Sequence, residues 1–136
     1  LPDPAREFTS FVKKFSFIDD NDQQNKLTII IERLIKSKVN PNQISILTFK
    51  SHETSFLNGK QFIYNQKLEN FSNTSEGLTW SNISSYKGLE NDFIILVETP
   101  EGDLDAYQKA LYYVALTRCK VEINILHKIN AKIGEL

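Results

Sequence analysis

The stretch SSYKGLENDFIILV, from Ser84 to Val97, places a charged turn directly before an apolar run. The run from Asp92 to Val97 has the composition of a strand, and its apolar residues are continuous rather than alternating. This pattern is typical of a strand buried on both faces, as in a parallel sheet that helices cover on both sides. The charged turn, which carries Lys87 and Glu90, therefore lies at one end of a central strand.

The segments before this stretch predict a helix followed by strands. Apolar residues recur at helical spacing from Leu27 to Ile35, and Asp20 with Gln23 three places later is typical of a capping box at the start of a helix. Pro41 ends this helix, because the residue before a proline avoids helical backbone angles. The β-branched segment from Ile44 to Thr48 predicts a short strand.

Other local patterns carry less signal. Near the N-terminus we favour a short helix and then a strand near Lys14 to Ile18. The pattern predicts a helix from His52 to Leu57 and a strand from Gln61 to Tyr64. A polar turn from Asn70 to Gly77 then leads into a strand from Trp80 to Ser85.

The segments after the charged stretch complete an alternating order. Leu104 to Val114 has an amphipathic helical pattern with Asp103 as its candidate N-cap, and apolar residues alternate along a last strand from Val121 to Ile125. Helices alternating with short apolar strands predict an α/β, three-layer domain with a mainly parallel sheet and helices on both faces. In such sheets ligands gather at the carboxyl ends of the strands, and we expect the Ser84–Glu90 turn and Arg118 at that edge.

Composition restricts the class of protein. The chain has 136 residues and a net charge of −1, so its overall charge does not mark a nucleic-acid binder. Its one cysteine, Cys119, cannot form an internal disulfide. No apolar run of membrane-spanning length and no signal-peptide pattern is present, so we expect a cytoplasmic protein without a membrane partner.

The chain contains no methionine, and it opens on Leu1-Pro2-Asp3-Pro4, which is typical of a linker. We interpret it as a piece of a longer protein, with a processed natural N-terminus as the alternative. We assign residues 1–18 to a linker or N-terminal extension, 19–127 to the domain and 128–136 to a tail.

Several chemistries are not supported by the motifs. The Gly59-Lys60 pair fails the phosphate-loop pattern G-x-x-x-x-G-K-[ST], because glutamine follows it. His52 and His127 are isolated, and no spacing suits a metal site. No Gly-x-Ser-x-Gly elbow is present. Glu98 follows four apolar residues, as a Walker B acid does, but without a phosphate loop we interpret that segment as the buried strand alone.

Two motifs carry a family resemblance. Ser85-Tyr86-Lys87-Gly88-Leu89-Glu90 and the run from Tyr113 to Lys120 resemble motifs V and VI of superfamily 1 DNA helicases of the UvrD/Rep type, with Cys119 where alanine is usual. The resemblance covers about residues 19–127 in architecture. It implies a second RecA-like domain that binds ATP with Mg²⁺ in a cleft against a first RecA-like domain, which is absent from this chain. It also implies single-stranded DNA as a partner.

The resemblance implies roles for residues in both motifs. Arg118 resembles the arginine finger, whose planar and permanently charged fork suits phosphate oxygens; the alternative is a helix-terminal arginine that contacts carbonyl groups. Glu90 resembles the residue that binds the ribose hydroxyl. Gly88 permits a tight turn or a close backbone approach. For Lys87 two roles stay open, a phosphate contact and a pair with an acid across the cleft.

Other positions depart from the family pattern. Asn82, Ser84 and Ser85 occupy the part of motif V that touches single-stranded DNA, where the family often has threonine and histidine at the first two positions. The segment from Ile44 resembles motif IV, but Phe49 replaces its ATP-binding arginine and Lys50 follows. The large domain that UvrD and Rep insert between motifs IV and V is missing, so the resemblance is to a compact member.

The resemblance therefore implies the C-terminal motor domain of an ATP-dependent DNA helicase or translocase, a domain that is inactive alone. The alternative is a non-catalytic, helicase-like module with a regulatory or docking role. The upstream sequence discriminates between them, because only a motor requires a phosphate loop and a Walker B acid there.

Overall fold

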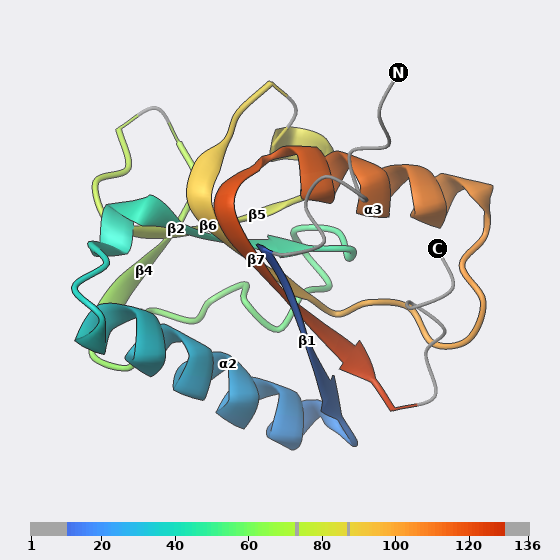
Figure 1. Cartoon of the computed structure of the whole chain (residues 1–136), viewed down its shortest axis with the longest axis horizontal. Coiled ribbons are helices and arrows are strands. Elements are labelled where there is room, and N and C mark those ends of the chain that lie inside the picture. Colours follow the sequence, from blue (N-terminus) through green and yellow to red (C-terminus); the bar gives the residue numbers. More distant parts are fainter. Residues whose placement is uncertain (1–10, 73, 87, 130–136) are drawn as a thin grey trace.

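The computed structural model describes residues 11–72, 74–86 and 88–129, and these form a seven-stranded sheet in the order β1-β7-β6-β2-β5-β4-β3 (Figure 1). Neighbouring strands are parallel, except for β3 and β4. The strands are β1 (Val12–Phe17), β2 (Ile44–Thr48), β3 (Phe62–Ile63), β4 (Gln66–Asn70), β5 (Leu78–Asn82), β6 (Asn91–Val97) and β7 (Cys119–Lys128). The helices are α2 (Asp20–Lys36) and α3 (Ala106–Thr117), with 3₁₀ turns η2 (Pro41–Gln43) and η3 (Ser84–Tyr86).

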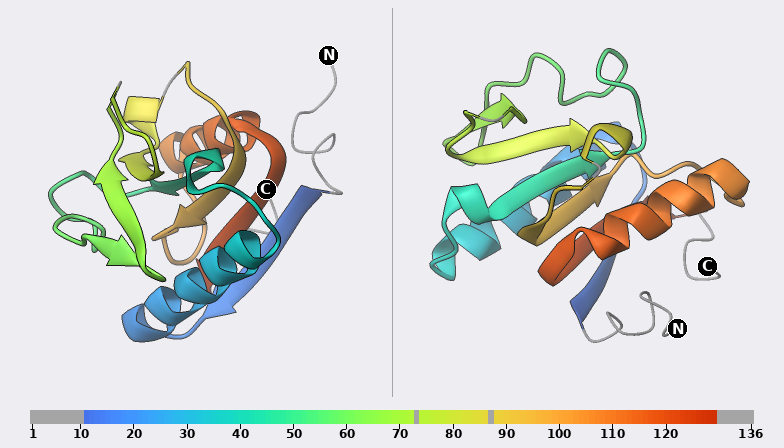
Figure 2. Two further views of the ribbon diagram at one scale, coloured as in Figure 1. Left: turned by 90° about the vertical axis from the view of Figure 1, so that its left-hand side faces the viewer. Right: turned by 90° about the horizontal axis from the view of Figure 1, so that it is seen from above.

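The two long helices lie on opposite sides of the sheet (Figures 1 and 2). On the α2 side, Ile95 belongs to a buried cluster with residues of the helix such as Leu34. On the α3 side, Ile94 and Leu96 belong to a second cluster with Leu116. Successive side chains of a strand point to opposite faces, so the apolar run of β6 fills both clusters. The predicted three-layer α/β architecture is confirmed.

Each helix begins beside the acid that the sequence pattern indicated. The N-cap of α2 is Asp19 rather than Asp20, and its carboxylate accepts a hydrogen bond from the Asp22 N–H at 2.8 Å. The N-cap of α3 is Asp105 rather than Asp103, in a capping box with Gln108. Both predicted caps were wrong because neighbouring aspartates offer equivalent local patterns, and backbone geometry selects between them.

The segment after β2 differs most from its prediction. Residues 52–59 form turns and a bend rather than a helix from His52 to Leu57. Hydroxyl groups there bond locally, as Ser51 Oγ does with Thr54 Oγ1 at 2.8 Å, while Ser55 Oγ donates to the distant Glu98. Side chains of this type compete with helical hydrogen bonds, which explains the error. The strand predicted from Trp80 to Ser85 runs from Leu78 to Asn82, and β4 lies largely in a segment for which no element was predicted.

Both ends of the described chain join the sheet. Strand β1 pairs in parallel with β7, with Val12 opposite Ile123, so most of the described part of the stretch assigned to a linker is an edge strand. Lys128, assigned to the tail, is the last residue of β7. The short helix predicted before β1 falls largely on residues outside the described part.

Candidate functional site

The ends of the two motifs meet at one edge of the sheet. Glu90 directly precedes β6, and Arg118 directly precedes β7, its parallel neighbour. The Asn91 N–H donates to the Arg118 carbonyl oxygen at 3.0 Å, so a main-chain hydrogen bond joins the two motifs. The structure therefore brings Arg118 and Glu90 together.

This edge is not the one that we expected. Both residues lie at the amino ends of the strands, so the prediction that they lie at the carboxyl edge was wrong. The connection from Ile83 to Glu90 leaves β5 at the carboxyl edge and returns across the α3 side, where Ile83 and Tyr86 are buried. A connection between parallel strands must make this return, so its last residues lie at the amino edge.

Arg118 is held by its backbone while most of its guanidinium group is uncommitted. The residue caps α3, and its N–H donates to the Ala115 carbonyl oxygen at 3.1 Å. Its Nη1 reaches the Leu89 carbonyl oxygen only at 3.5 Å. Its Nε is buried without a hydrogen-bond partner in the described chain, and no described carboxylate pairs with it. A buried, unpaired N–H is unfavourable, and an anion beside Arg118 would satisfy it.

Glu90 is accessible at the same edge. Its carboxylate pairs with Lys120 at 3.4 Å, and both side chains are more than half exposed (58% and 52%). Such surface pairs contribute little, about 0–1 kcal/mol, so the carboxylate stays available to a hydroxyl donor. Gly88 has φ +78, and a Cβ built there meets no atom within 4 Å, so the turn rather than a close approach requires glycine. Lys87 lies outside the described residues.

One buried hydroxyl anchors the connection to the sheet. Ser45 Oγ, in β2, lies 3.0 Å from the Tyr86 hydroxyl and 3.1 Å from Thr79 Oγ1, and it accepts a hydrogen bond from Asn91 Nδ2 at 2.9 Å. Three contacts use the full capacity of a hydroxyl group. Burial raises the pKa of Tyr86. The hydrogen bond between Tyr86 and Ser45 acts to lower this pKa, and the nearby Glu90 carboxylate acts to raise it further.

The residues predicted to bind nucleic acid lie at the opposite, carboxyl edge. Asn82 ends β5 and accepts a hydrogen bond from the Ser85 N–H through Oδ1 at 2.7 Å. Ser84 and Ser85 are exposed. Asn82 and Ser84 line a hollow of about 240 Å³, and Asn82 and Ser85 line another of about 370 Å³. The five residues of β2 span ~16 Å between the two edges, so these side chains do not share a pocket with Arg118.

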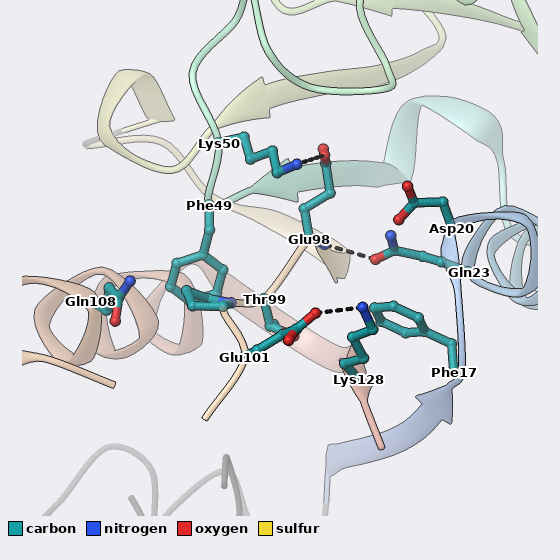
Figure 3. Close-up of a pocket in the computed structure, with 11 residues that line it drawn as sticks. Phe17, Asp20, Gln23, Phe49, Lys50, Glu98, Thr99, Glu101, Gln108 and Lys128 are labelled. Carbon is teal, nitrogen blue, oxygen red and sulfur yellow. Dashed lines mark hydrogen bonds and ion pairs between the residues drawn. The ribbon is translucent and has the colours of Figure 1, made fainter. Parts of the chain in front are cut away.

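A buried acid at the carboxyl edge was not predicted as part of any site. Glu98 follows β6 with φ +57, and its carboxylate accepts hydrogen bonds from Thr48 (2.9 Å) and from Ser55. Its N–H donates to the Gln23 side chain at 2.8 Å, and Lys50 Nζ lies 3.6 Å from its second oxygen (Figure 3). Its position after four apolar residues was the one available sequence signal. Phe49 and Lys50 also lie at this edge, far from Arg118.

The remaining candidate residues have structural surroundings. Trp80 is buried, and His52 stacks on it with the ring centroids 5.0 Å apart. Cys119 is buried, and burial raises the pKa of its thiol to about 11. In the part of the chain that the structure describes, no group of three His, Cys, Asp or Glu side chains suits a metal ion. Neither described helix has the combination of length and apolar character that crossing a membrane requires.

No family model matches the sequence, and no curated protein matches it. Among solved structures, the chain is similar to the C-terminal domain of a possible DNA helicase from Lactobacillus plantarum WCFS1. The TM-score is 0.66, and the match covers 95% of this chain and 83% of that one. The two domains share a fold. Because only 13% of the matched residues are identical, the likeness concerns architecture, and it agrees with the RecA-like fold expected from the motifs.

Proposed function

We propose that this chain is the C-terminal motor domain of an ATP-dependent DNA helicase or translocase of the UvrD/Rep type, cytoplasmic and inactive alone. The observation that carries the proposal is the amino edge of the sheet, where Arg118 and Glu90 lie together and no carboxylate among the described residues pairs with Arg118. A hydrogen bond of 3.0 Å from the Asn91 N–H to the Arg118 carbonyl oxygen joins the two motifs there. The architecture shared with the C-terminal domain of a possible DNA helicase supports it.

The amino edge suits half of an ATP site. Arg118 would contact terminal phosphate oxygens and stabilise the charge that develops during phosphoryl transfer. Glu90 would accept a hydrogen bond from a ribose hydroxyl, and the turn at Gly88 would hold it there. The first RecA-like domain would supply the phosphate loop and most of the Mg²⁺ contacts.

The carboxyl edge of the sheet suits the binding of single-stranded DNA. The side chains of Asn82, Ser84 and Ser85 would donate hydrogen bonds to phosphate oxygens, which fixes the position of a strand without reading its sequence. ATP binding would close the two motor domains, and hydrolysis would release them. The connection from Ile83 to Glu90 reaches both edges of the sheet. It would couple ATP binding at the amino edge to the binding of single-stranded DNA at the carboxyl edge.

Arg118→Ala tests the proposal in the longer polypeptide that contains both motor domains. We expect the turnover number for ATP hydrolysis to fall by about 10³-fold or more, as for other arginine fingers, while ATP binding persists. Lys109→Ala, an exposed charge on the same helix, is the matched control and should keep the wild-type rate. Turnover within two-fold of the wild type in the Arg118 variant would refute the assignment.

A non-catalytic docking module is the second candidate function. Phe49 favours it, since this residue packs against the α3-side cluster where the motif IV pattern has an ATP-binding arginine. A polypeptide whose upstream part lacks a phosphate loop and a Walker B acid would support this reading over the motor.

A further inference from the structure

Three hollows lie in a row along the carboxyl edge of the sheet. The first, of about 340 Å³, is lined by Phe17, Glu98 and Lys128 from the ends of β1, β6 and β7, and we call it the acidic hollow. The second and third are those beside Ser84 and Ser85, and we call them the middle and far hollows. The acidic and middle hollows share Phe49 and Lys50, and the middle and far hollows share Asn82. Each hollow therefore adjoins the next.

The charge of the lining changes along this row. Three acids line the acidic hollow, namely Asp20, Glu98 and Glu101. The described side chains that line the middle and far hollows include hydroxyls, amides and aromatic rings, and no carboxylate is among them. Lys50 and Lys128 line the acidic hollow too, and they pair with Glu98 and Glu101, so three acids and two lysines leave its lining with one net negative charge. This hollow is therefore less favourable for a phosphate chain than the other two.

Lys50 stands at the boundary between these environments. Its ammonium group lies 3.6 Å from the Glu98 carboxylate, and its side chain is 55% exposed (Figure 3). Glu98 is itself fixed, because Thr48 and Ser55 donate to its carboxylate. The lysine is thus held at the end of the middle hollow, while its remaining N–H donors stay open to a second anion.

We propose that Lys50 contacts a phosphate of a single nucleic-acid strand that occupies the middle and far hollows, and that the acidic hollow ends the path of the strand. The inference rests on the proposed function and adds to it a charged contact and a boundary for the path of the strand. The Ser84 hydroxyl and the Asn82 amide line the same hollow as Lys50 and would bond neighbouring phosphate oxygens.

Lys128 provides a matched comparison. It also lines the acidic hollow and also pairs with a glutamate, Glu101, but it does not line the middle hollow. Lys128→Gln therefore removes the same charge at the same edge without removing the proposed contact.

The test is binding of a fluorescent oligothymidylate to the 136-residue chain by anisotropy, over a series of salt concentrations. For Lys50→Gln we expect affinity to fall about three- to ten-fold, and the slope of log K against log salt to become shallower by about 0.7, the value for one phosphate on a single strand. Lys50→Arg, which keeps the charge, should restore both quantities. Lys128→Gln should change affinity less than two-fold. Circular dichroism checks that each variant is folded.

The outcomes separate the two proposals. Equal effects of Lys50→Gln and Lys128→Gln, or an unchanged salt slope in Lys50→Gln, would overturn the role of Lys50 and leave the proposed function standing. A folded wild-type chain that does not bind the oligonucleotide even at low salt would count against both. Loss of ATP hydrolysis in Arg118→Ala bears on the proposed function alone.

Discussion

The amino and carboxyl edges of this sheet differ in how they hold their charged groups. At the amino edge, Arg118 and Glu90 are placed by the backbone, and their side chains have few commitments. At the carboxyl edge, Glu98 is buried and bonded by hydroxyl groups, and it fixes Lys50 in turn. The first arrangement suits a ligand that a second domain helps to enclose, whereas the second suits a preformed groove. The two edges of one sheet therefore hold their charged groups in two different ways.

The largest effect on stability is expected at Ser45, the buried residue of β2 whose hydroxyl group holds the Ile83–Glu90 connection to the sheet. Ser45→Ala leaves the buried Tyr86 hydroxyl without its partner and removes contacts to Thr79 and Asn91, so we expect the free energy of unfolding to fall by about 2–3 kcal/mol. Urea denaturation measures it. Ser84→Ala, an exposed serine, should change it by no more than about 0.5 kcal/mol. Equal free energies of unfolding for the two variants would mean that the hydrogen bonds of Ser45 do not stabilise the fold.

Substitutions at two glycines can distinguish an effect on stability from an effect on the proposed nucleotide site. Gly88 and Gly102 both have positive φ, +78 and +71, and open space around a built Cβ. Alanine at either position should lower the free energy of unfolding by about 1 kcal/mol, because left-handed backbone angles are strained for other residues. Only Gly88→Ala should also weaken ATP hydrolysis in the two-domain polypeptide. Similar rates of ATP hydrolysis in both variants would show that Gly88 does not contribute to the ATP site.

The smallest effect concerns the acid Glu122 in β7. Burial acts to raise the pKa of its carboxyl group, but hydrogen bonds from Arg33, Asn124 and Lys13 outweigh burial and lower it. The stability that this group contributes is therefore present above its ordinary pKa and is lost as the pH falls through the lowered value.

Urea midpoints at pH 7 and pH 3 test the contribution of Glu122. Glu122→Gln should reduce the loss of stability in acid by about 0.5 kcal/mol, in the range of a partly exposed ion pair. Glu76→Gln, on an exposed loop, should leave the acid loss unchanged. An equal acid loss in the Glu122 variant and the wild type would show that Arg33 does not stabilise the charged form.

Local patterns predicted the layers of the fold better than its details. The apolar run of β6 indicated burial on both faces, and Ile94 and Ile95 do enter opposite clusters. The turns after β2 were predicted as a helix because propensity ignores side chains that bond elsewhere. Ser55, for example, bonds an acid 43 residues away, which no local pattern reports.

The sequence predicted that Arg118 and Glu90 lie close together, but it did not predict the correct edge of the sheet. Arg118 and Glu90 each precede a strand, and parallel neighbouring strands bring such residues together. The choice of edge failed because a rule about carboxyl ends was applied to residues that come before strands. The surroundings of Glu98 depend on Gln23, 75 residues away, so they required the tertiary structure.

The hydroxyl of Ser45 also has an evolutionary consequence. Because its hydrogen-bonding capacity is fully used, alanine or a larger side chain at this position would disturb three elements at once. Divergent members of this lineage should therefore retain a small hydroxyl-bearing residue at the second position of β2, even where the charged motifs have drifted. That serine then becomes a landmark for aligning distant homologues by structure.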